Sequence, residues 1–411
     1  MHKQNVSKLH IDERCEYRLR RGLPWLFDKY CDFGRSPVPA VGDLVAVYGR
    51  RNQCVGVGLY DPYSPVRVRM LGAPCEFGRE MIAARIACAL ARRAEAHIVD
   101  ADTNALRLLS GESEGLPGLV IDGYADTWVL KVYASCWLPY LSDVIEILSS
   151  YRAEDSMPFG VSPTRMVLRF GRECRPVYEK AGYVEASLAF GEVDTPYSEF
   201  LEHGAVFRAQ VFRGQKTGFF LDQRLNRQLI RRLSEGRKVL DICCYSGGFS
   251  INAAIGGADS VWSLDGDRHA LELVDMHYGL NAHHAGVSKS EHVLQRGNMF
   301  DWLARAKSRA QKFDLIIADP PCFASSQAQI ATAEKAYMRL FSSAADCLKP
   351  HGQILCCSCS SHIGGEKFAD LVRRTLWHRA IDSVDYTGLP ADHVATFAEA
   401  RYLKAWLVTV R

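Results

Sequence analysis

The stretch "VLDICCYSGGFS" (residues 239–250) decides the fold class. It begins as an apolar strand, carries an acid at Asp241, and ends in the glycines Gly247 and Gly248, after which the residues become helix-like. A flexible glycine turn between a strand and a helix lets backbone N–H groups and the helix N-terminus approach a polar ligand closely. The stretch therefore predicts a strand, a turn and a helix with a ligand at the strand end.

The same alternation of strand, turn and helix continues to the end of the chain. Seven strand-like runs, several of them separated by helical stretches, cover residues 238–243, 261–265, 292–296, 313–319, 353–359, 381–386 and 402–410. Strands that alternate with helices indicate a parallel sheet covered on both faces, in which ligands bind beyond the C-terminal strand ends. We therefore predict an α/β, Rossmann-like domain over residues 191–411.

Polar residues follow the strands at the edge where a ligand is expected. Asp265 ends the second strand, where it is placed to accept hydrogen bonds from both hydroxyls of a ribose. Asn298 follows the third strand and is placed to contact an adenine edge, with Met299 packed on the ring. Each residue alone has an equally good structural explanation as a helix cap, a turn residue or a core side chain. Together with the acid and the glycine turn of the first strand, these residues make three such positions on successive strands, which favours a nucleoside site.

The fourth strand leads into "DPPCF" (residues 319–323). Two prolines fix the backbone and remove two N–H donors, which favours a rigid wall that holds Asp319 against a planar ring. A connecting loop would not need such rigidity.

The first 190 residues have a different organisation. Short β-rich runs over residues 41–70 predict a small barrel or sandwich, and the helical spacing of residues 79–96 marks a boundary near residue 73. Further strands and helices predict a small α+β domain that ends near residue 190. We therefore expect three domains, at residues 1–72, 73–190 and 191–411.

Composition and charge limit the class of protein. The 411 residues are 48% hydrophobic and 24% charged, as in ordinary globular proteins. The sequence contains no run of about 18 apolar residues, the length that a helix needs to span a bilayer. The fourteen cysteines include adjacent pairs, which favour reduced thiols and a cytoplasmic location. Residues 1–70 carry a net charge of +5, whereas the whole chain carries +3, so the positive charge is concentrated in this region. The basic region suggests phosphate contacts, although a solvated basic face explains the charge equally well.

Several motifs carry a resemblance to a known family. The order "VLDICCYSGGFS", "FDLIIADPPCF" (313–323) and "LCCSCSSHI" (355–363) resembles class I S-adenosylmethionine (SAM)-dependent methyltransferases. More narrowly, "GQKTGFFLDQRLNR" (214–227) is similar to the bacterial large-subunit ribosomal RNA methyltransferase I family, which methylates C5 of a cytidine. The resemblance extends over nearly the whole chain, with residues 21–30 and 55–71 resembling the family's PUA RNA-binding domain.

The resemblance implies a SAM pocket made of strand-end residues. It implies that the pocket is lined by Asp241, Tyr245, Gly247, Asp265, Asn298 and Asp319, and closed by Phe219, Asp222 and Arg224. Two positions depart from the family pattern: Asp267 stands where a serine or similar residue is usual, and Asn298 where an acid is more frequent. Either change could alter the strength of SAM binding.

The resemblance also implies covalent chemistry. Cytosine C5 is a poor nucleophile until a thiolate adds to C6 of a base turned out of its stack. The "SCS" at residues 358–360 resembles the "TCS" motif of RNA cytosine-C5 methyltransferases, which assigns Cys359 as the nucleophile, while Asp319 would stabilise charge on the ring. Cys322 matches a cysteine that assists release in more distant enzymes, but the nearer family more often has lysine there, and a small core cysteine is an equally simple explanation.

Two other functions stay open. "DPPCF" also resembles the loops of amino-methylating enzymes, in which Phe323 would stack on the base without a covalent adduct. The chain could also be a ribosome-assembly factor that binds RNA and no longer turns over. We expect large-subunit ribosomal RNA or its precursor as the partner, with contacts from Arg20, Arg21 and Lys216, and no membrane; a homodimer is compatible with the sequence. The CxxC of Cys356 and Cys359 lacks a second ligand pair, so we expect no metal.

Overall fold

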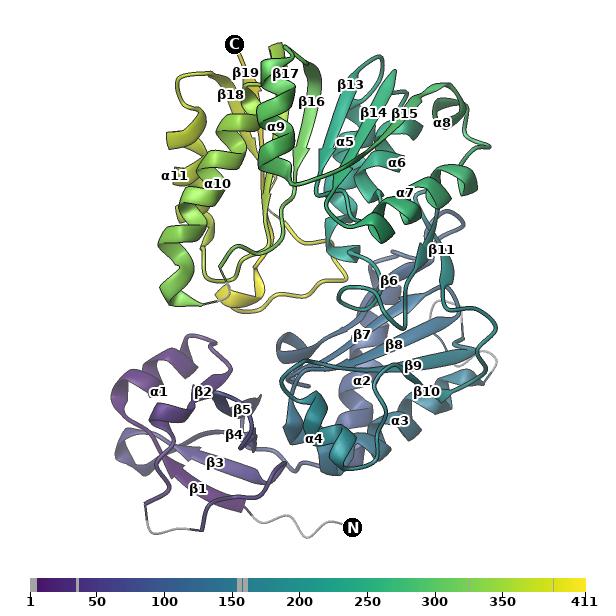
Figure 1. Cartoon of the computed structure of the whole chain (residues 1–411). Coiled ribbons are helices and arrows are strands. Elements are labelled where there is room, and N and C mark those ends of the chain that lie inside the picture. The colour runs from purple at the N-terminus through teal and green to yellow at the C-terminus, as the bar shows by residue number, and fades with distance from the viewer. Residues whose placement is uncertain (1–5, 35–36, 154–156, 158–161, 325, 387) are drawn as a thin grey trace. The chain divides into compact units, whose positions relative to one another are not determined.

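The computed structural model describes the whole chain except residues 1–5, 35–36, 154–156, 158–161, 325 and 387 (Figure 1). The chain forms two compact units. The first contains residues 1–202, 208–221 and 391–398, and the second contains residues 203–207, 222–390 and 399–411. Each unit is described separately below.

The second unit is built on a seven-stranded sheet with the order β15-β14-β13-β16-β17-β19-β18 (Figure 1). Its strands are β13 (Lys238–Ile242), β14 (Ser260–Asp265), β15 (Glu291–Arg296), β16 (Phe313–Ala318), β17 (Leu348–Ser358), β18 (Ala380–Asp385) and β19 (Lys404–Val410). The strands from β15 to β17 run parallel, and β19 runs antiparallel to both of its neighbours. The predicted Rossmann-like α/β fold is confirmed, and the C-terminal ends of β13 to β17 lie at one edge.

Helices cover this sheet. They are α5 (Arg224–Leu233), α6 (Gly248–Ile255), α7 (Arg268–Leu280), α8 (Ala285–Lys289), α9 (Met299–Ser308), α10 (Ile330–Ala345) and α11 (Gly365–Leu376). The buried side chains of α9, α10 and α11 share one apolar core with β16, β17 and β19. Tyr337, Phe341 and Phe368 are fully buried in this core, so α10 and α11 hold the loops after β16 and β17 in place.

The first unit begins with a five-stranded sheet of order β1-β3-β4-β5-β2. Its elements are β1 (Val6–His10), α1 (Glu13–Arg20), β2 (Trp25–Phe27), β3 (Leu44–Tyr48), β4 (Cys54–Tyr60) and β5 (Val66–Gly72). The last three strands lie in the predicted β-rich region, whereas β1 and β2 were not predicted. Because β1 pairs with β3 across more than thirty residues and buries only Leu9, its local sequence gives little sign of a strand.

A second five-stranded sheet follows in the same unit, with the order β10-β9-β8-β7-β6. Its elements are α2 (Arg79–Glu95), β6 (Ala105–Ser110), β7 (Leu119–Tyr124), β8 (Thr127–Val132), α3 (Leu141–Ser149), β9 (Arg165–Phe170), α4 (Arg175–Lys180) and β10 (Ser187–Phe190). Leu44 and Leu59 of the first sheet belong to the same apolar core as Trp137 and Leu141. The chain then forms the hairpin of β11 (Ser198–Glu202) and β12 (Ala205–Ala209).

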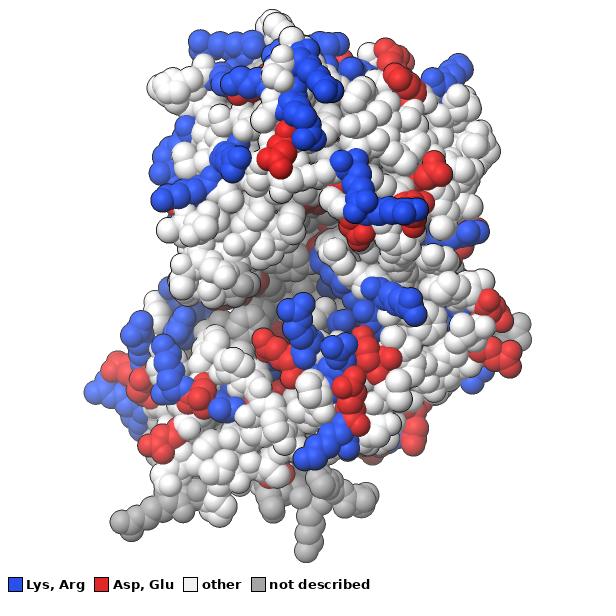
Figure 2. Space-filling view, viewed as in Figure 1, with Lys and Arg blue, Asp and Glu red and all other residues white. Residues whose placement is uncertain are grey.

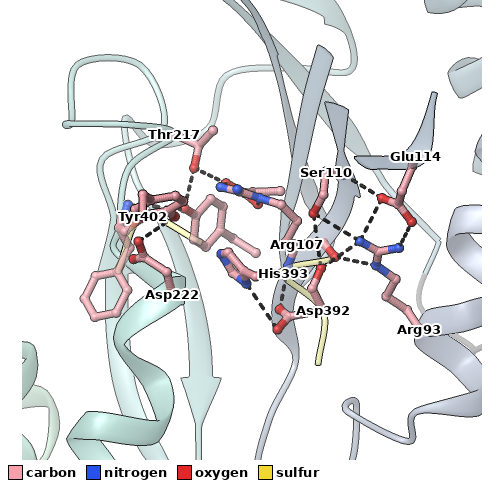
Figure 3. A network of polar contacts seen from close by, with 12 residues as sticks. Arg93, Arg107, Ser110, Glu114, Thr217, Asp222, Asp392, His393 and Tyr402 are labelled. Atoms are coloured by element: carbon pink, nitrogen blue, oxygen red, sulfur yellow. Dashed lines mark hydrogen bonds and ion pairs between the residues drawn. The ribbon is translucent and has the colours of Figure 1, made fainter. Parts of the chain in front are cut away.

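Two later segments of the chain are held in the first unit by buried polar contacts (Figure 3). Arg93, which is 1% exposed, pairs with Glu114 and donates to the backbone oxygen of Asp392 at 2.7 Å. The Arg107 backbone N–H donates to the Asp392 carboxylate at 2.8 Å. In the other segment, the Thr217 hydroxyl donates to Asp122 of β7 at 2.5 Å. Buried charge pairs of this kind fix one geometry more than they add stability, so they set where each segment leaves the unit.

No helix within the described residues is long and apolar enough to cross a membrane. The fourteen cysteines all lie within those residues, and none of them forms a disulfide.

Candidate active site

The end of β13 carries a buried acid. Asp241 is fully buried, and its Oδ2 accepts hydrogen bonds from the Ser250 backbone N–H at 3.1 Å and the Ser250 hydroxyl at 2.7 Å. Burial raises the pKa of Asp241 to about 7, the Ser250 hydroxyl opposes the shift, and the neighbouring Asp319 and Asp265 add to it. The other oxygen, Oδ1, accepts no hydrogen bond from any residue that the structure describes. A buried carboxylate oxygen of this kind fits a ligand that brings a donor or a positive charge, as SAM does.

The turn after β13 brings the backbone to the next strand end. Cys243 and Tyr245 have positive φ angles of 61° and 49°, and this tight turn aims the Tyr245 backbone N–H at Asp265, 2.9 Å from its Oδ2. The Asp267 N–H donates to the other oxygen of Asp265 at 2.9 Å. Since each carboxylate oxygen can accept two hydrogen bonds, Asp265 is held rigidly and can still accept two hydroxyls.

Gly247 is the N-cap of α6 and has a φ of 76°. A Cβ at this position would lie 2.9 Å from a methyl carbon of Val274. Both the conformation and the close approach therefore require glycine, as the strand-turn-helix prediction implies.

The residues after β15 have partly structural roles. The Asn298 side-chain oxygen caps α9, accepting from the backbone N–H of Phe300 at 2.9 Å. The sulfur of half-buried Met299 lies 3.5 Å from the sulfur of Cys243. The adenine contact predicted for Asn298 therefore depends on its amide nitrogen, because its oxygen already caps the helix.

The segment before α5 places the other predicted SAM residues in two units. Asp222 and Arg224 are buried in the second unit, where the Tyr402 hydroxyl donates to Asp222 at 2.7 Å (Figure 3). Phe219 belongs to the first unit, 2% exposed, with its ring edge-on to Phe200 at a centroid distance of 5.1 Å. Lys216 belongs to the first unit as well, with its ammonium 4.5 Å from the ring centre of Phe220. A place in the SAM pocket for Phe219 and an RNA contact for Lys216 both remain predictions.

Asp319, at the end of β16, is held by two amides that the sequence did not indicate. The Gln223 side chain donates to Asp319 Oδ2 at 2.8 Å, and the Asn226 amide donates to the oxygen of Gln223 at 2.6 Å. Gln223 and Asn226 are 3% and 2% exposed. Both lie inside the 214–227 motif, and their spacing of three residues at the start of α5 is the signal that could have revealed them.

The loop after β16 and the turn after β17 are bonded to each other. The thiol of exposed Cys322 donates to the Ala324 carbonyl at 3.0 Å, and the Ser360 hydroxyl donates to the same carbonyl at 3.1 Å. The Ser358 hydroxyl donates to the Tyr337 hydroxyl at 3.0 Å. The two serines of "SCS" therefore fix the backbone on each side of half-buried Cys359.

The three residues predicted to be catalytic share one electrostatic neighbourhood. Burial raises the pKa of Tyr337, the Ser358 hydroxyl opposes this shift, and negative charge on Cys359, Cys322 and Asp319 adds to it. Because charge interactions weaken with distance, these contributions indicate that all three groups lie in the neighbourhood of the Tyr337 hydroxyl.

The predicted RNA contacts of α1 are on the surface of the first unit. Arg20 pairs with Glu16 at 2.7 Å, and Arg21 donates to the Tyr17 hydroxyl at 3.0 Å. Figure 2 shows Lys and Arg side chains interspersed with Asp and Glu over the visible face. An exposed ion pair, as of Arg20, or an exposed hydrogen bond, as of Arg21, costs little to break, so both arginines can turn to a phosphate.

Known proteins show the same organisation. Residues 188–385 match the family described as "S-adenosylmethionine-dependent methyltransferase", and residues 9–72 match the PUA-like domain. The solved structure described as "SMU.776, a putative methyltransferase complexed with SAH" is similar with a TM-score of 0.81 and 21% identity, covering 98% of this chain and 100% of that one. The fold and the two family matches thus identify a SAM-dependent methyltransferase with a PUA-like N-terminal domain, as the sequence predicted.

Similarity to curated relatives extends over the full length. A protein of Deinococcus radiodurans named "Ribosomal RNA large subunit methyltransferase" is 38% identical over 97% of this chain and 96% of its own length. "Ribosomal RNA large subunit methyltransferase I" of Tolumonas auensis is 30% identical over 98% of this chain and 99% of its own. The chain belongs to this family of ribosomal RNA large subunit methyltransferases.

Proposed function

We propose that the protein transfers a methyl group from SAM to C5 of a cytidine in large-subunit ribosomal RNA. The observation that carries the proposal is the position of Cys359 directly after β17, in the same neighbourhood as Asp319 and Cys322. The names of the curated relatives support ribosomal RNA as the substrate. Reduced thiols support action in the cytoplasm, where thiols stay reduced.

The site residues divide the reaction between them. Bound SAM supplies the methyl group as an electrophile; Asp265 would hold its ribose hydroxyls and Asp241 would face its positive charge. The Cys359 thiolate adds to C6 of the cytosine and makes C5 nucleophilic. Asp319 donates to or accepts from the ring edge at N3 and the exocyclic amine, where charge develops. A base then takes the C5 proton, the C6–S bond breaks with its electron pair returning to the Cys359 sulfur, and Cys322 would assist this release.

Amino-methylation on the same fold remains the alternative. It would need Phe323 to stack on the target base, but the ring of Phe323 packs against Tyr337 with a centroid distance of 4.8 Å and an interplanar angle of 61°. This contact favours a structural role for Phe323 and supports C5 chemistry.

The decisive experiment is a covalent trap. Protein and SAM are incubated with large-subunit RNA that contains 5-fluorocytidine, whose fluorine cannot leave as the proton does, and the products are separated on a denaturing gel and identified by mass spectrometry. We expect an adduct on the Cys359 peptide, no adduct with Cys359→Ala, and an unchanged adduct with Cys88→Ala, a surface cysteine on α2. Methyl transfer without an adduct would establish the amino-methylating alternative. Neither adduct nor transfer, on naked RNA or on ribosomal particles, would favour a binding factor.

We also propose that Arg20, Arg21 and Lys216 contact the RNA backbone. Replacing each by Ala should weaken RNA binding and lower the slope of log affinity against log salt by about one per lost phosphate contact. Arg374→Ala serves as the control, because Arg374 is an exposed arginine of α11 paired with Asp370. Affinity and salt slope equal to those of the control would remove these residues from the interface.

A further inference from the structure

A buried lysine begins the last strand of the sheet. Lys404 is the first residue of β19 and pairs in register with Ser358, next to Cys359. Its side chain is 1% exposed in a strand that is otherwise mostly apolar. A lysine is almost never buried to this degree unless its charge is compensated, so the position calls for a functional explanation.

The hydrogen bonds of Lys404 orient its ammonium without neutralising it. The ammonium donates to the backbone carbonyls of Ser360 and Tyr402, the latter at 2.6 Å. Within the described part of the chain, no carboxylate lies within 4.0 Å of this ammonium. Two carbonyl dipoles fix its direction, but neither carries the negative charge that a buried cation requires.

The acidic groups near Lys404 are thiols. Burial lowers the pKa of Lys404 to about 8, and negative charge on Cys359 first and Cys322 second opposes this shift. Cys359 belongs to the turn after β17, and Cys322 belongs to the loop after β16. Further ionisable groups near these thiols are Tyr337 on α10, Asp319 and the buried thiol of Cys357 on β17. A thiolate is therefore the anion that this arrangement offers to the ammonium.

We propose that the Lys404 ammonium is the counter-ion that holds Cys359 as a thiolate, which makes Lys404 a positioning residue for the nucleophile. The inference rests on the proposed C5 chemistry for its purpose. The proton balance is simple: the Cys359 thiol gives its proton to the Lys404 amine, and the resulting pair of thiolate and ammonium faces the substrate. When the C6–S bond breaks at the end of the reaction, the Cys359 thiolate forms again and pairs with the same ammonium.

The test measures the Cys359 thiol directly and needs no RNA. The protein is alkylated with iodoacetamide across pH 6 to 10, and the Cys359 peptide is quantified by mass spectrometry, with exposed Cys88 as the internal reference. In the wild type we expect an apparent thiol pKa below the ordinary value of about 8.5. Lys404→Met, which keeps the length of the side chain but removes its charge, should raise the Cys359 thiol pKa by about one unit or more. In Lys404→Arg, which keeps the charge, the Cys359 pKa should stay nearer the wild-type value.

Each outcome decides the inference. A wild-type Cys359 pKa at or above the ordinary value overturns it, as does an unchanged pKa in a Lys404→Met protein that still binds SAM. If Lys404→Met does not fold, as judged by SAM binding, Lys404→Arg decides: a retained low pKa supports the inference and an ordinary one overturns it.

Failure of the inference and failure of the proposed function are distinguishable. A 5-fluorocytidine adduct with an ordinary Cys359 pKa removes the role of Lys404 and leaves the C5 chemistry. A lowered pKa that depends on Lys404, with no adduct, leaves the pairing and removes the chemistry.

Discussion

The two halves of the strand-end edge are built from different groups. In the half where we propose that SAM binds, here called the cofactor half, at the ends of β13, β14 and β15, the acids Asp241 and Asp265 are held by backbone N–H groups and a serine. In the acceptor half, at the ends of β16 and β17 and the start of β19, the groups are Asp319, two thiols and a buried ammonium, held by amide side chains, hydroxyls and carbonyls.

The difference follows from what each half has to do. Backbone donors have fixed positions and do not titrate, so they suit a site that holds one ligand in one position. Thiols and a lysine change protonation within a few units of neutral pH, so they suit a site where protons move during turnover. Substitutions in the cofactor half should therefore weaken SAM binding, whereas substitutions in the acceptor half should lower kcat.

The largest expected effect is the loss of the nucleophile in the acceptor half. Cys359→Ala should lower kcat by at least about 10⁴-fold, as removal of a covalent nucleophile does in other enzymes, and change the Kd for SAM by no more than about twofold. Single-turnover methyl transfer and calorimetric SAM binding measure the two quantities. A comparable loss in Cys356→Ala, a buried neighbour on β17, would indicate a packing effect rather than a missing nucleophile.

A smaller effect is expected from the ring-stabilising acid. Asp319→Asn should lower kcat by about 10² to 10³-fold, the range seen when one group that stabilises developing charge is removed. Gln223→Ala should cost less, about tenfold, because it leaves the carboxylate in place and removes only the hydrogen bond at 2.8 Å that orients it. Measuring kcat at saturating SAM separates a loss of catalytic rate in these variants from weaker cofactor binding. Equal losses in both variants would contradict a direct contact of Asp319 with the base.

The cofactor half should show the opposite pattern. Asp265→Ala should raise the Kd for SAM by about 10 to 100-fold, because it removes charge-assisted hydrogen bonds to the ribose. At saturating SAM, kcat should stay within a few-fold of the wild type. Asp267→Ala is the neighbouring comparison, since the Asp267 side chain caps α7 through the His269 N–H at 2.9 Å, and its loss should lower stability and change the Kd for SAM much less than Asp265→Ala does. A kcat loss in Asp265→Ala that SAM cannot restore would show that the two halves are not separable.

The cofactor half was largely predictable from sequence because its signals are local. Asp241, Gly247 and Asp265 stand at strand ends in a chain whose strand-turn-helix alternation is regular, and all seven strands of the sheet were predicted. Asn298 shows the limit of such reasoning, because a residue after a strand is also the first candidate for a helix cap, and the structure uses its oxygen that way.

The supporting groups of the acceptor half were not predictable because they depend on pairing between distant segments. Gln223 meets Asp319 across 96 residues, and Lys404 meets Ser360 across 44. A lysine within an apolar strand was visible in the sequence, but its partners become apparent only when β19 pairs antiparallel to β17.

The smallest effect concerns the charge of Asp241 itself. Burial raises the pKa of this carboxyl to about 7, well above its usual value, so the folded protein without SAM binds more protons at this site than the unfolded chain does. Stability contributed by the protonated form should therefore be present below about pH 4 and fall as the pH rises towards 7, by at most about 1.4 kcal/mol per pH unit. Denaturant unfolding of the wild type and of Asp241→Asn across this range measures the difference. The variant should lack this decline and be at least as stable as the wild type at pH 8. Parallel profiles would mean that Asp241 is ionised at neutral pH before SAM arrives, and that its charge is matched by the protein alone.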